Sequence, residues 1–372
     1  MILAVPKETA PKERRVALVP ETVAKFVKLG AQVRVQAGAG AAAAFPDDAY
    51  AAAGAAIAAD APAAIAGATA VLTVGRPADG LLDALPPGTV VVGFLNPLGD
   101  PAFVERLAKA RLTALAVEMI PRITRAQSMD ALSSQSNISG YKAVLLAAAA
   151  LPKFFPMLTT AAGTIAPAKL LVLGAGVAGL QAIATARRLG AVVSGYDVRA
   201  VVKEQVQSLG AHFLEFDLGA DAEGQGGYAK ELTPEQQERQ RAWMVDQIGA
   251  NDVVVTTALV PGRRAPVLIS QAAVDAMKPG SVIVDIAAEA GGNCVATVPD
   301  ETVVTANGVT VIGTTNLPST MPKDASQLYS RNLYALLSPW IKDAELKIDM
   351  DDDVAKGAVV AAAGDALVGA KP

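Results

Sequence analysis

The sequence predicts an α/β fold with two doubly wound parallel-sheet domains, separated by a cleft and linked by long helices. Three observations lead to this prediction. The chain has 372 residues, more than twice the roughly 150 residues of a typical domain. Short apolar runs alternate with helical stretches in two successive series, as in βαβ units. One glycine-rich turn, which starts at Gly174, follows a strand of the second series.

The first series predicts the sheet of an N-terminal domain. Helical spacing follows Pro20 and Pro101, and proline is tolerated in the first turn of a helix because its missing N–H has no partner there. The alanine-rich segment 41–68 is expected to be helical, because alanine has the highest helix propensity. The predicted strands are residues 2–5, 33–36, 70–74, 90–94 and 112–117.

A long helix is predicted from Ser133 to Leu151, with Asp130, Ser133 and Ser134 as capping candidates. The second series follows it, and residues 220–241 read as a loop that runs into a helix. A last helix, residues 325–341, would return the chain to the first domain. We therefore expect an N-terminal domain of residues 1–132 and 322–372 and a second domain of residues 133–321. The predicted strands of the second domain are residues 170–173, 192–196, 213–216, 253–256, 282–285 and 309–312.

Composition and charge exclude several classes of partner. Hydrophobic residues make up 52% of the chain and charged residues 18%, which is typical of a globular protein. The net charge of −4 gives no positive field for nucleic acid or an anionic membrane surface. One cysteine, Cys294, and one histidine, His212, exclude a disulfide framework and a zinc site built from several thiolates or imidazoles. With no signal-peptide pattern and no strongly apolar run of about 18 residues, a cytoplasmic location is expected.

The strongest motif is a glycine pattern between a predicted strand and a predicted helix. Gly174 permits a tight turn, Gly176 lets backbone N–H groups approach a pyrophosphate, and Gly179 lets the helix pack closely on the strand. The next strand ends at Asp197, whose carboxylate would accept hydrogen bonds from an adenosine ribose and repel a 2′-phosphate. This Rossmann-like context predicts a site for NAD(H) rather than NADP(H). Ala175 and Val177 complete the turn, and Val198 follows the acidic residue.

Further candidates lie near this motif. Arg199 could contact a 2′-phosphate, or it could be a solvated charge at the start of a helix. Ligands of doubly wound sheets bind beyond the carboxyl ends of the strands. The loops after the later strands are therefore also candidates, although their glycines and prolines could be turn formers only. The residues singled out in these loops are Ala258, Leu259, Glu289 and Asn316.

The sequence offers no clear acid or base for oxidising an alcohol or amine. His212 lies at the front of a predicted strand, where a surface or packing role is expected. Hydride transfer between two nicotinamide rings needs close approach, alignment and exclusion of water, but no general acid or base at the carbon centres. The residue inventory favours that reaction.

These motifs resemble those of the NAD(H)-binding alpha subunits of proton-translocating NAD(P) transhydrogenases, which are relatives of alanine dehydrogenase. The resemblance implies that Arg122 and Gln127 hold the nicotinamide and its ribose, with Asp130 and Ser133 supporting their loop. It also implies that Gly227 and Tyr228 belong to a loop that closes over the nucleotide. The segments that carry the resemblance are residues 5–8, 13–20, 122–137, 173–199, 256–262 and 277–293.

The resemblance also implies partners. NADP(H) would be bound by a separate beta subunit, and a membrane-spanning alpha-type subunit would supply the proton channel. The chain would then be a homodimer on the cytoplasmic face of the inner membrane, associated with that membrane through these partners. The transhydrogenase would be the Si-specific type.

Two other functions stay open at this point. An NAD-dependent alanine dehydrogenase would carry a histidine, an aspartate and a substrate lysine at positions that here are Asn96, Glu289 and the segment 73–77. Arg15 does match the substrate arginine of that enzyme, or it forms a structural ion pair. A non-catalytic NAD-binding module is the third possibility.

Overall fold

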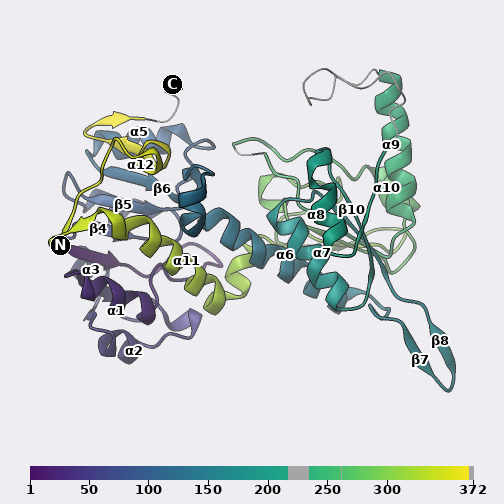
Figure 1. Cartoon of the computed structure of the whole chain (residues 1–372), viewed down its shortest axis with the longest axis horizontal. Coiled ribbons are helices and arrows are strands. Elements are labelled where there is room, and N and C mark those ends of the chain that lie inside the picture. The colour runs from purple at the N-terminus through teal and green to yellow at the C-terminus, as the bar shows by residue number, and fades with distance from the viewer. Residues whose placement is uncertain (217–233, 261, 368–372) are drawn as a thin grey trace. The chain divides into compact units, whose positions relative to one another are not determined.

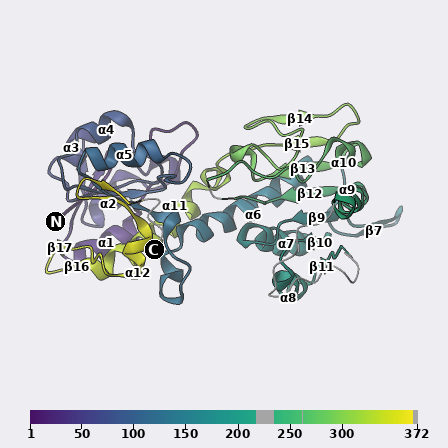
Figure 2. The same ribbon diagram turned by 90° about the horizontal axis from the view of Figure 1, so that it is seen from above.

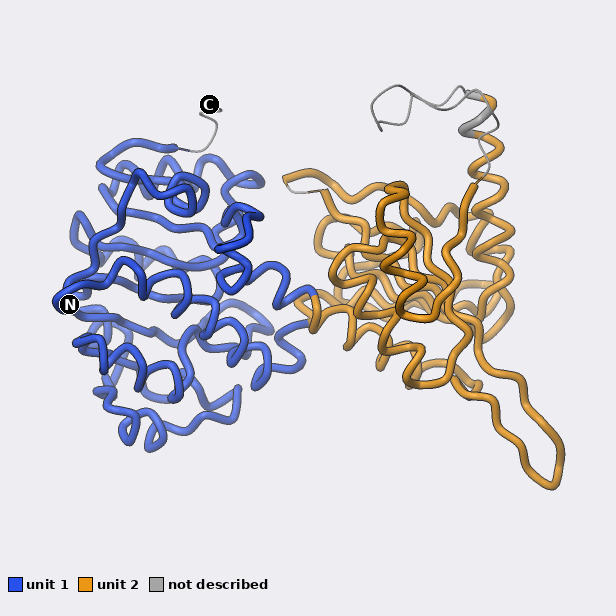
Figure 3. The backbone as a smooth tube through the Cα atoms, viewed as in Figure 1, with its two compact units in different colours: residues 1–136, 318–372 blue, residues 137–317 orange. Residues whose placement is uncertain are grey.

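The computed structural model describes residues 1–216, 234–260 and 262–367. The chain divides into two compact units, residues 1–136 with 318–372 and residues 137–317 (Figure 3). The first boundary falls inside α6 (Ala131–Ala150), and the second falls inside a 3-10 helix (Leu317–Thr320). Each unit is built on its own large sheet.

Unit 1 is built on a sheet that has eight strands in the described residues, in the order β19-β18-β6-β5-β4-β1-β2-β3. The strands β1 to β6 run parallel. Their order is that of a doubly wound sheet, and the winding direction switches between β1 and β4. These strands are β1 (Ile2–Val5), β2 (Gln32–Gln36), β3 (Ala56–Ala58), β4 (Ala70–Leu72), β5 (Val90–Gly93) and β6 (Thr113–Ala116).

Helices pack on both faces of this sheet because side chains alternate along each strand. Leu3 and Val5 join a core that contains Phe26 of α1 and Tyr329 of α11, whereas Ala4 joins a core that contains Phe103 of α5. Figure 1 shows the elements. The helices of unit 1 are α1 (Pro20–Lys28), α2 (Asp47–Ala52), α3 (Ala61–Ile65), α4 (Asp79–Asp83), α5 (Pro101–Lys109), α11 (Pro322–Leu337) and α12 (Asp353–Ala358).

Two parts of unit 1 differ from the prediction. The alanine-rich segment contains a strand, β3, which pairs with β2, so its helical prediction was wrong at residues 56–58. Backbone pairing to an existing sheet overrides the helix propensity of alanine there. The C-terminal alanines were not predicted as strands, yet β18 (Val359–Ala362) pairs with β6 and with β19 (Asp365–Ala366). A small hairpin, β16 (Ile341–Lys342) with β17 (Glu345–Leu346), precedes them.

Unit 2 has the same strand order. Its sheet, seen from above in Figure 2, runs β11-β10-β9-β12-β13-β15-β14 over seven strands in the described residues. All neighbours are parallel except β14 and β15, and the winding switches between β9 and β12. The strands are β9 (Lys169–Leu173), β10 (Val192–Tyr196), β11 (His212–Phe213), β12 (Val253–Thr256), β13 (Val282–Asp285), β14 (Thr302–Val304) and β15 (Thr310–Ile312).

Helices again cover both faces. Val172 belongs to a core with Ile183 of α7, while Leu173 belongs to a core with Ile248 of α9. The parallel α/β architecture predicted from the sequence is therefore confirmed. The predicted strand 213–216 is wrong in extent, because β11 pairs with β10 through His212 and Phe213 alone. The helices are α7 (Val177–Arg188), α8 (Lys203–Ser208), α9 (Pro234–Gly249) and α10 (Gln271–Ala276).

A hairpin that the sequence did not predict projects from the body of unit 2 (Figure 1). It consists of β7 (Leu158–Thr160) and β8 (Gly163–Ile165), which pair only with each other in the described residues. Large apolar side chains at its base and on its strands are exposed, with 63% exposure for Met157 and 45% for Ile165. No helix in the described part of the chain is long and apolar enough to cross a bilayer.

Candidate functional site

The predicted glycine turn lies at the switch point of unit 2. Gly174 follows β9 and has a φ of +98°, which L side chains rarely adopt. A Cβ atom here would lie 2.5 Å from Oγ1 of Thr257, the residue that follows β12. The same hydroxyl donates to the carbonyl oxygen of Gly174 at 2.9 Å. Thr257 therefore fixes the turn from the neighbouring strand.

The turn delivers the chain directly into α7. A Cβ atom on Gly179 would lie 1.8 Å from the carbonyl oxygen of Gly174, so this position requires glycine. Gly176, the N-cap residue of α7, is different, because a Cβ atom there would meet no described atom within 4 Å. No described side chain caps this end of the helix. Open space in front of uncapped helical N–H groups is the geometry that binds phosphate.

The helix that precedes the turn also depends on glycine. A Cβ atom on Gly140 of α6 would lie 2.0 Å from the carbonyl oxygen of Ala178, in the first turn of α7. Gly140 was not among the residues singled out from the sequence, since a lone glycine inside a helical pattern gives no sign of what it packs against.

Asp197 lies one residue beyond β10, beside the glycine turn. Its Oδ2 atom accepts a hydrogen bond from the N–H of Ala175 at 2.7 Å. Arg199 binds it with a two-pronged ion pair, Nε to Oδ1 and Nη2 to Oδ2, both at 2.9 Å. The Asp197 side chain is only 6% exposed, whereas that of Arg199 is 53% exposed. Burial raises the pKa of the Asp197 carboxyl, but the hydrogen bonds from Arg199 and Ala175 outweigh it, so the pKa is lowered and the group is ionised.

Arg199 therefore has a partner that neither sequence interpretation anticipated. It is neither a freely solvated charge nor directed only at a ligand, because its guanidinium is bound to Asp197. Val198, between the two, is 82% exposed, and Leu259 after β12 is 53% exposed. Exposed apolar side chains on two neighbouring strand ends are suited to contact with a flat aromatic ring.

A buried carboxylate organises the loops after β12 and β13. Asp285 is fully buried and accepts hydrogen bonds from five described donors, among them Oγ1 of Thr256 at 2.9 Å and Oγ1 of Thr297 at 2.7 Å. One donor is the N–H of Asn293, at 2.7 Å. The Asn293 amide in turn accepts from the N–H of Ala258 at 3.1 Å and donates to its carbonyl at 2.9 Å. Asp285 thus fixes the position of Ala258 through Asn293.

Asp285 and Asn293 lie in a loop that the sequence marked as a candidate, but Glu289 was the residue chosen from that loop. Glu289 is exposed, and its carboxylate accepts a hydrogen bond from the N–H of Asn316. An aspartate at the end of an otherwise apolar strand was the available signal for Asp285, because a buried carboxylate must have several donors.

The segment implied to hold the nicotinamide belongs to unit 1. Arg122 and Gln127 are both exposed, and Gln127 lies in a 3-10 helix (Thr124–Met129). Asp130 ends this segment and accepts hydrogen bonds from the N–H and the Oγ of Ser133, at 2.8 and 2.6 Å. The predicted capping role of Asp130 at α6 is therefore confirmed. Gly227 and Tyr228 lie outside the described residues.

Asn332 of α11 supports the same segment. Its amide donates to the carbonyl of Ser128 at 2.8 Å and accepts from Oγ of Ser134 at 2.7 Å. Arg125 forms an ion pair with Asp352, so it is not available to a ligand in this arrangement.

Unit 1 has a pocket of about 280 Å³ at its own switch point. Glu8, after β1, lines it and accepts a hydrogen bond from the N–H of Val74, after β4, at 2.6 Å. Burial raises the pKa of Glu8 to about 7, assisted by the nearby Glu13 and opposed by the bond from Val74. Arg15 forms an ion pair with Glu13 at 2.7 Å and donates to Gln135, which agrees with the structural alternative for this arginine.

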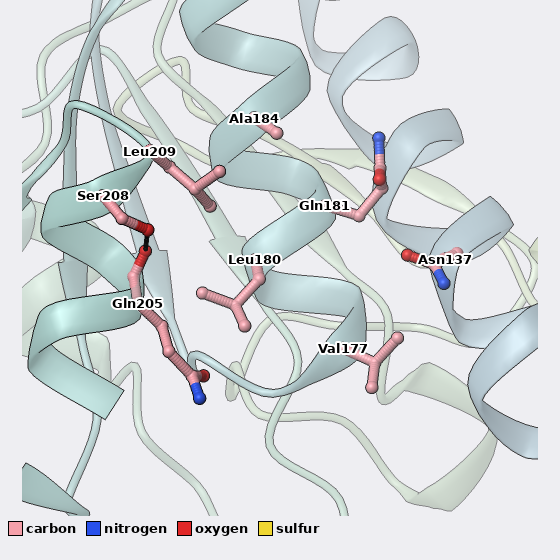
Figure 4. A pocket seen from close by; sticks show the side chains of 8 residues that line it. All are labelled: Asn137, Val177, Leu180, Gln181, Ala184, Gln205, Ser208 and Leu209. Atoms are coloured by element: carbon pink, nitrogen blue, oxygen red, sulfur yellow. Dashed lines mark hydrogen bonds between the residues drawn. The ribbon is translucent and has the colours of Figure 1, made fainter. Parts of the chain in front are cut away.

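A second pocket, of about 330 Å³, lies in unit 2 among α6, α7 and α8 (Figure 4). Leu180 and Gln181 of α7 line it together with Gln205 of α8. It flanks the helices rather than the carboxyl ends of the strands, so the glycine turn and Asp197 lie outside it.

The chain matches one family along nearly its whole length. Residues 4–139 match the model described as "Alanine dehydrogenase/PNT, N-terminal domain", and residues 143–368 match the corresponding C-terminal domain. The first of the separate parts of the NAD(P) transhydrogenase alpha subunit of Rhodospirillum rubrum is 48% identical over 369 residues, which cover 97% of this chain and 96% of that polypeptide. A solved structure of a transhydrogenase from Sinorhizobium meliloti is 42% identical, with a TM-score of 0.88, and covers 98% of this chain and 100% of that chain.

A more distant relative is an alanine dehydrogenase of Bacillus subtilis. It is 29% identical over 336 residues, which cover 88% of this chain and 82% of that enzyme.

Proposed function

Because the chain belongs to the alanine dehydrogenase/PNT family of oxidoreductases, we propose that it is the NAD(H)-binding alpha subunit of a proton-translocating NAD(P) transhydrogenase. In this role it binds NAD(H) and exchanges a hydride with NADP(H) held by a partner subunit. Proton translocation is the task of other, membrane-spanning subunits. Each part of this proposal has support in a particular group of residues.

The observation that carries the proposal is the combination of Gly176 and Asp197 at the switch point of unit 2. Gly176 leaves space before the uncapped N-terminus of α7, where a pyrophosphate would accept hydrogen bonds from backbone N–H groups. Asp197 is ionised, so it accepts hydrogen bonds from ribose hydroxyls and repels a 2′-phosphate. The residues therefore fit NAD(H) better than NADP(H). Val198, Leu259 and Ala258 would contact the adenosine part.

Arg122 and Gln127 are proposed to orient the nicotinamide ring. Both side chains are exposed, and Asp130 and Ser133 hold the end of their segment in place. When bound, NADH supplies the hydride, and this chain supplies its alignment. Alignment alone is a large effect, because a misplacement of about 1 Å can cost about 10²-fold in rate.

The alternative function, alanine oxidation, has no proton-handling group at the expected positions. Asn96 stands in place of the dehydrogenase histidine, and its backbone N–H is bound to Glu118. Glu289 stands in place of the aspartate and is bound to the N–H of Asn316. Arg15, the one match, is paired with Glu13. These three observations favour the transhydrogenase role.

Partners are proposed on the same basis. The name of the Rhodospirillum relative describes one portion of a divided alpha subunit, which implies that further polypeptides complete the assembly. We propose an NADP(H)-binding beta subunit and a membrane-spanning alpha-type subunit, with membrane association through them. A homodimer is supported by the hairpin β7–β8, because Phe154, Met157 and Ile165 expose apolar surface that a second copy could cover.

One experiment with three reaction mixtures tests this function. The purified chain is mixed with NADH and an NADP⁺ analogue, with and without the NADP(H)-binding subunit, and separately with alanine and NAD⁺. We expect hydride exchange only when the partner subunit is present. Formation of NADH from alanine by the chain alone would establish the dehydrogenase instead, and NADH binding without turnover in any mixture would indicate a non-catalytic module.

A further inference from the structure

The carboxylate of Asp197 has no acceptor position left for a ribose. An ionised carboxylate offers about four acceptor positions. In the described residues, Oδ1 receives the N–H and the Nε of Arg199, and Oδ2 receives the N–H of Ala175 and the Nη2 of Arg199. The distances lie between 2.7 and 2.9 Å, so all four are good hydrogen bonds.

Two of these four donors are fixed and two can leave. The N–H groups of Ala175 and Arg199 belong to the backbone of the glycine turn and of the segment after β10. The guanidinium of Arg199 is on a long side chain that is 53% exposed, so it can rotate into solvent without disturbing the turn. The two guanidinium donors are therefore the pair that two ribose hydroxyls would replace.

We propose that Arg199 is an internal competitor of the adenosine ribose: its guanidinium fills the ribose-reading oxygens of Asp197 and has to be displaced when the nucleotide binds. This inference rests on the proposed function, since it assumes that Asp197 reads a ribose. The affinity for NAD(H) is then reduced by the fraction of molecules in which the pair is closed. The competitor also keeps a buried carboxylate paired while the site has no nucleotide.

A competitor role predicts the opposite of simple charge attraction. A cation near a pyrophosphate should aid binding, so its removal should weaken the affinity. If Arg199 is a competitor, its removal should strengthen it. The sign of the change therefore decides between the two roles.

The test is a titration of the purified full chain with NADH, followed by nucleotide fluorescence. Arg199→Ala should bind NADH roughly threefold to tenfold more tightly, the range expected for loss of a half-exposed ion pair. The difference should narrow as salt is raised, because salt screens the pair in the unsubstituted chain. Arg199→Lys, which keeps the charge but loses the two-pronged geometry, should fall between the two.

Two controls make the result specific. Arg188→Ala removes an exposed positive charge from the same unit, at the end of α7, and should leave the affinity for NADH unchanged. The gain of Arg199→Ala should be smaller for 2′-deoxyadenosine 5′-monophosphate than for adenosine 5′-monophosphate, because the former has one hydroxyl fewer to place on Asp197. Thermal unfolding of each variant checks that the fold is intact.

The failures of the two proposals are distinguishable. Unchanged or weaker NADH binding by Arg199→Ala, with normal binding by the unsubstituted chain, overturns the competitor role and leaves the proposed function standing. If no protein in the series binds NADH, the proposed function fails and the competitor role fails with it.

Discussion

The two units share one strand order but treat its switch point differently. In unit 2, β9 passes through Gly174 straight into α7, and the N-terminus of that helix has no side-chain cap among the described residues. In unit 1, β1 is followed by Pro6, Lys7 and Glu8, and the next helix begins only at Pro20. The carboxyl group of Glu8 itself takes up the N–H of Val74 after β4.

Unit 1 thus fills its switch point with its own acidic side chain, whereas unit 2 leaves its backbone donors open to an anion from outside. The fold provides the place in both units, and a few residues decide whether it is a nucleotide site. Four variants probe this difference, in order of decreasing effect.

The largest effect is expected from Gly179→Ala. Its Cβ atom would lie 1.8 Å from a backbone oxygen, so α7 must move off β9. We expect a loss of about 3 kcal/mol or more in the free energy of unfolding, and a melting temperature lower by about 6 °C or more. Gly176→Ala is the matched control: its Cβ meets open space at a φ of −79°, so stability should hold while NADH binding weakens. Equal NADH binding by Gly176→Ala and the unsubstituted chain would show that no pyrophosphate lies there.

The second effect concerns the contribution of unit 1 to the reaction. Gln127→Asn shortens an exposed side chain by one methylene group and should misplace the nicotinamide ring. We expect about 10²-fold slower hydride exchange in the reconstituted complex, with little change in NADH affinity. Stopped-flow transfer rates and NADH titration measure the two separately. Equal losses of rate and affinity would mean that Gln127 binds the nucleotide without positioning its ring.

The third effect tests the acidic group at the switch point of unit 1. Because the pKa of Glu8 is raised from 4.5 to about 7 in the folded chain, the folded state binds its proton more tightly than the unfolded state between these values. The free energy of unfolding should therefore fall as the pH rises through this range, by about 2 kcal/mol. Glu8→Gln mimics the protonated group, so it should lose this pH dependence and be more stable than the unsubstituted chain above pH 7. Glu105→Gln, an exposed change in α5, should behave like the unsubstituted chain in denaturant titrations at each pH.

The smallest effect is expected from Asp197→Ala. Loss of the carboxylate removes the acceptor of the ribose and the repulsion of a 2′-phosphate, so NADH should bind about tenfold more weakly and NADPH should be discriminated less. Parallel titrations with both nucleotides measure this. Unchanged selectivity would show that another residue reads the ribose.

Features with a local cause could be predicted from the sequence. The strand Val253–Thr256, the helix that starts at Pro101 and the cap at Asp130 follow from apolar spacing, a proline position and a short polar side chain. The glycine turn could be recognised for the same reason, because its conformational needs lie within a few residues. The placement of Glu289 and Asn316 beside each other agrees with the expectation that strand-end loops meet.

Features that need a distant partner could not. β3 and β18 are strands because β2 and β6 offer them backbone groups, and an alanine-rich sequence does not show that offer. The hairpin β7–β8 has almost no core of its own, so its strands leave no apolar alternation to detect.

By itself, the sequence therefore determined the alternating α/β pattern, the nucleotide turn and its acidic partner, since each depends on neighbours along the chain. Only the tertiary structure decided that Asp285 holds Ala258 through Asn293, that Glu8 takes up the N–H of Val74, and that Arg199 occupies the oxygens of Asp197. The physical reason is that a polar group becomes committed to a partner when folding removes it from water and leaves few donors within reach. Which donors those are depends on the packing of the whole unit.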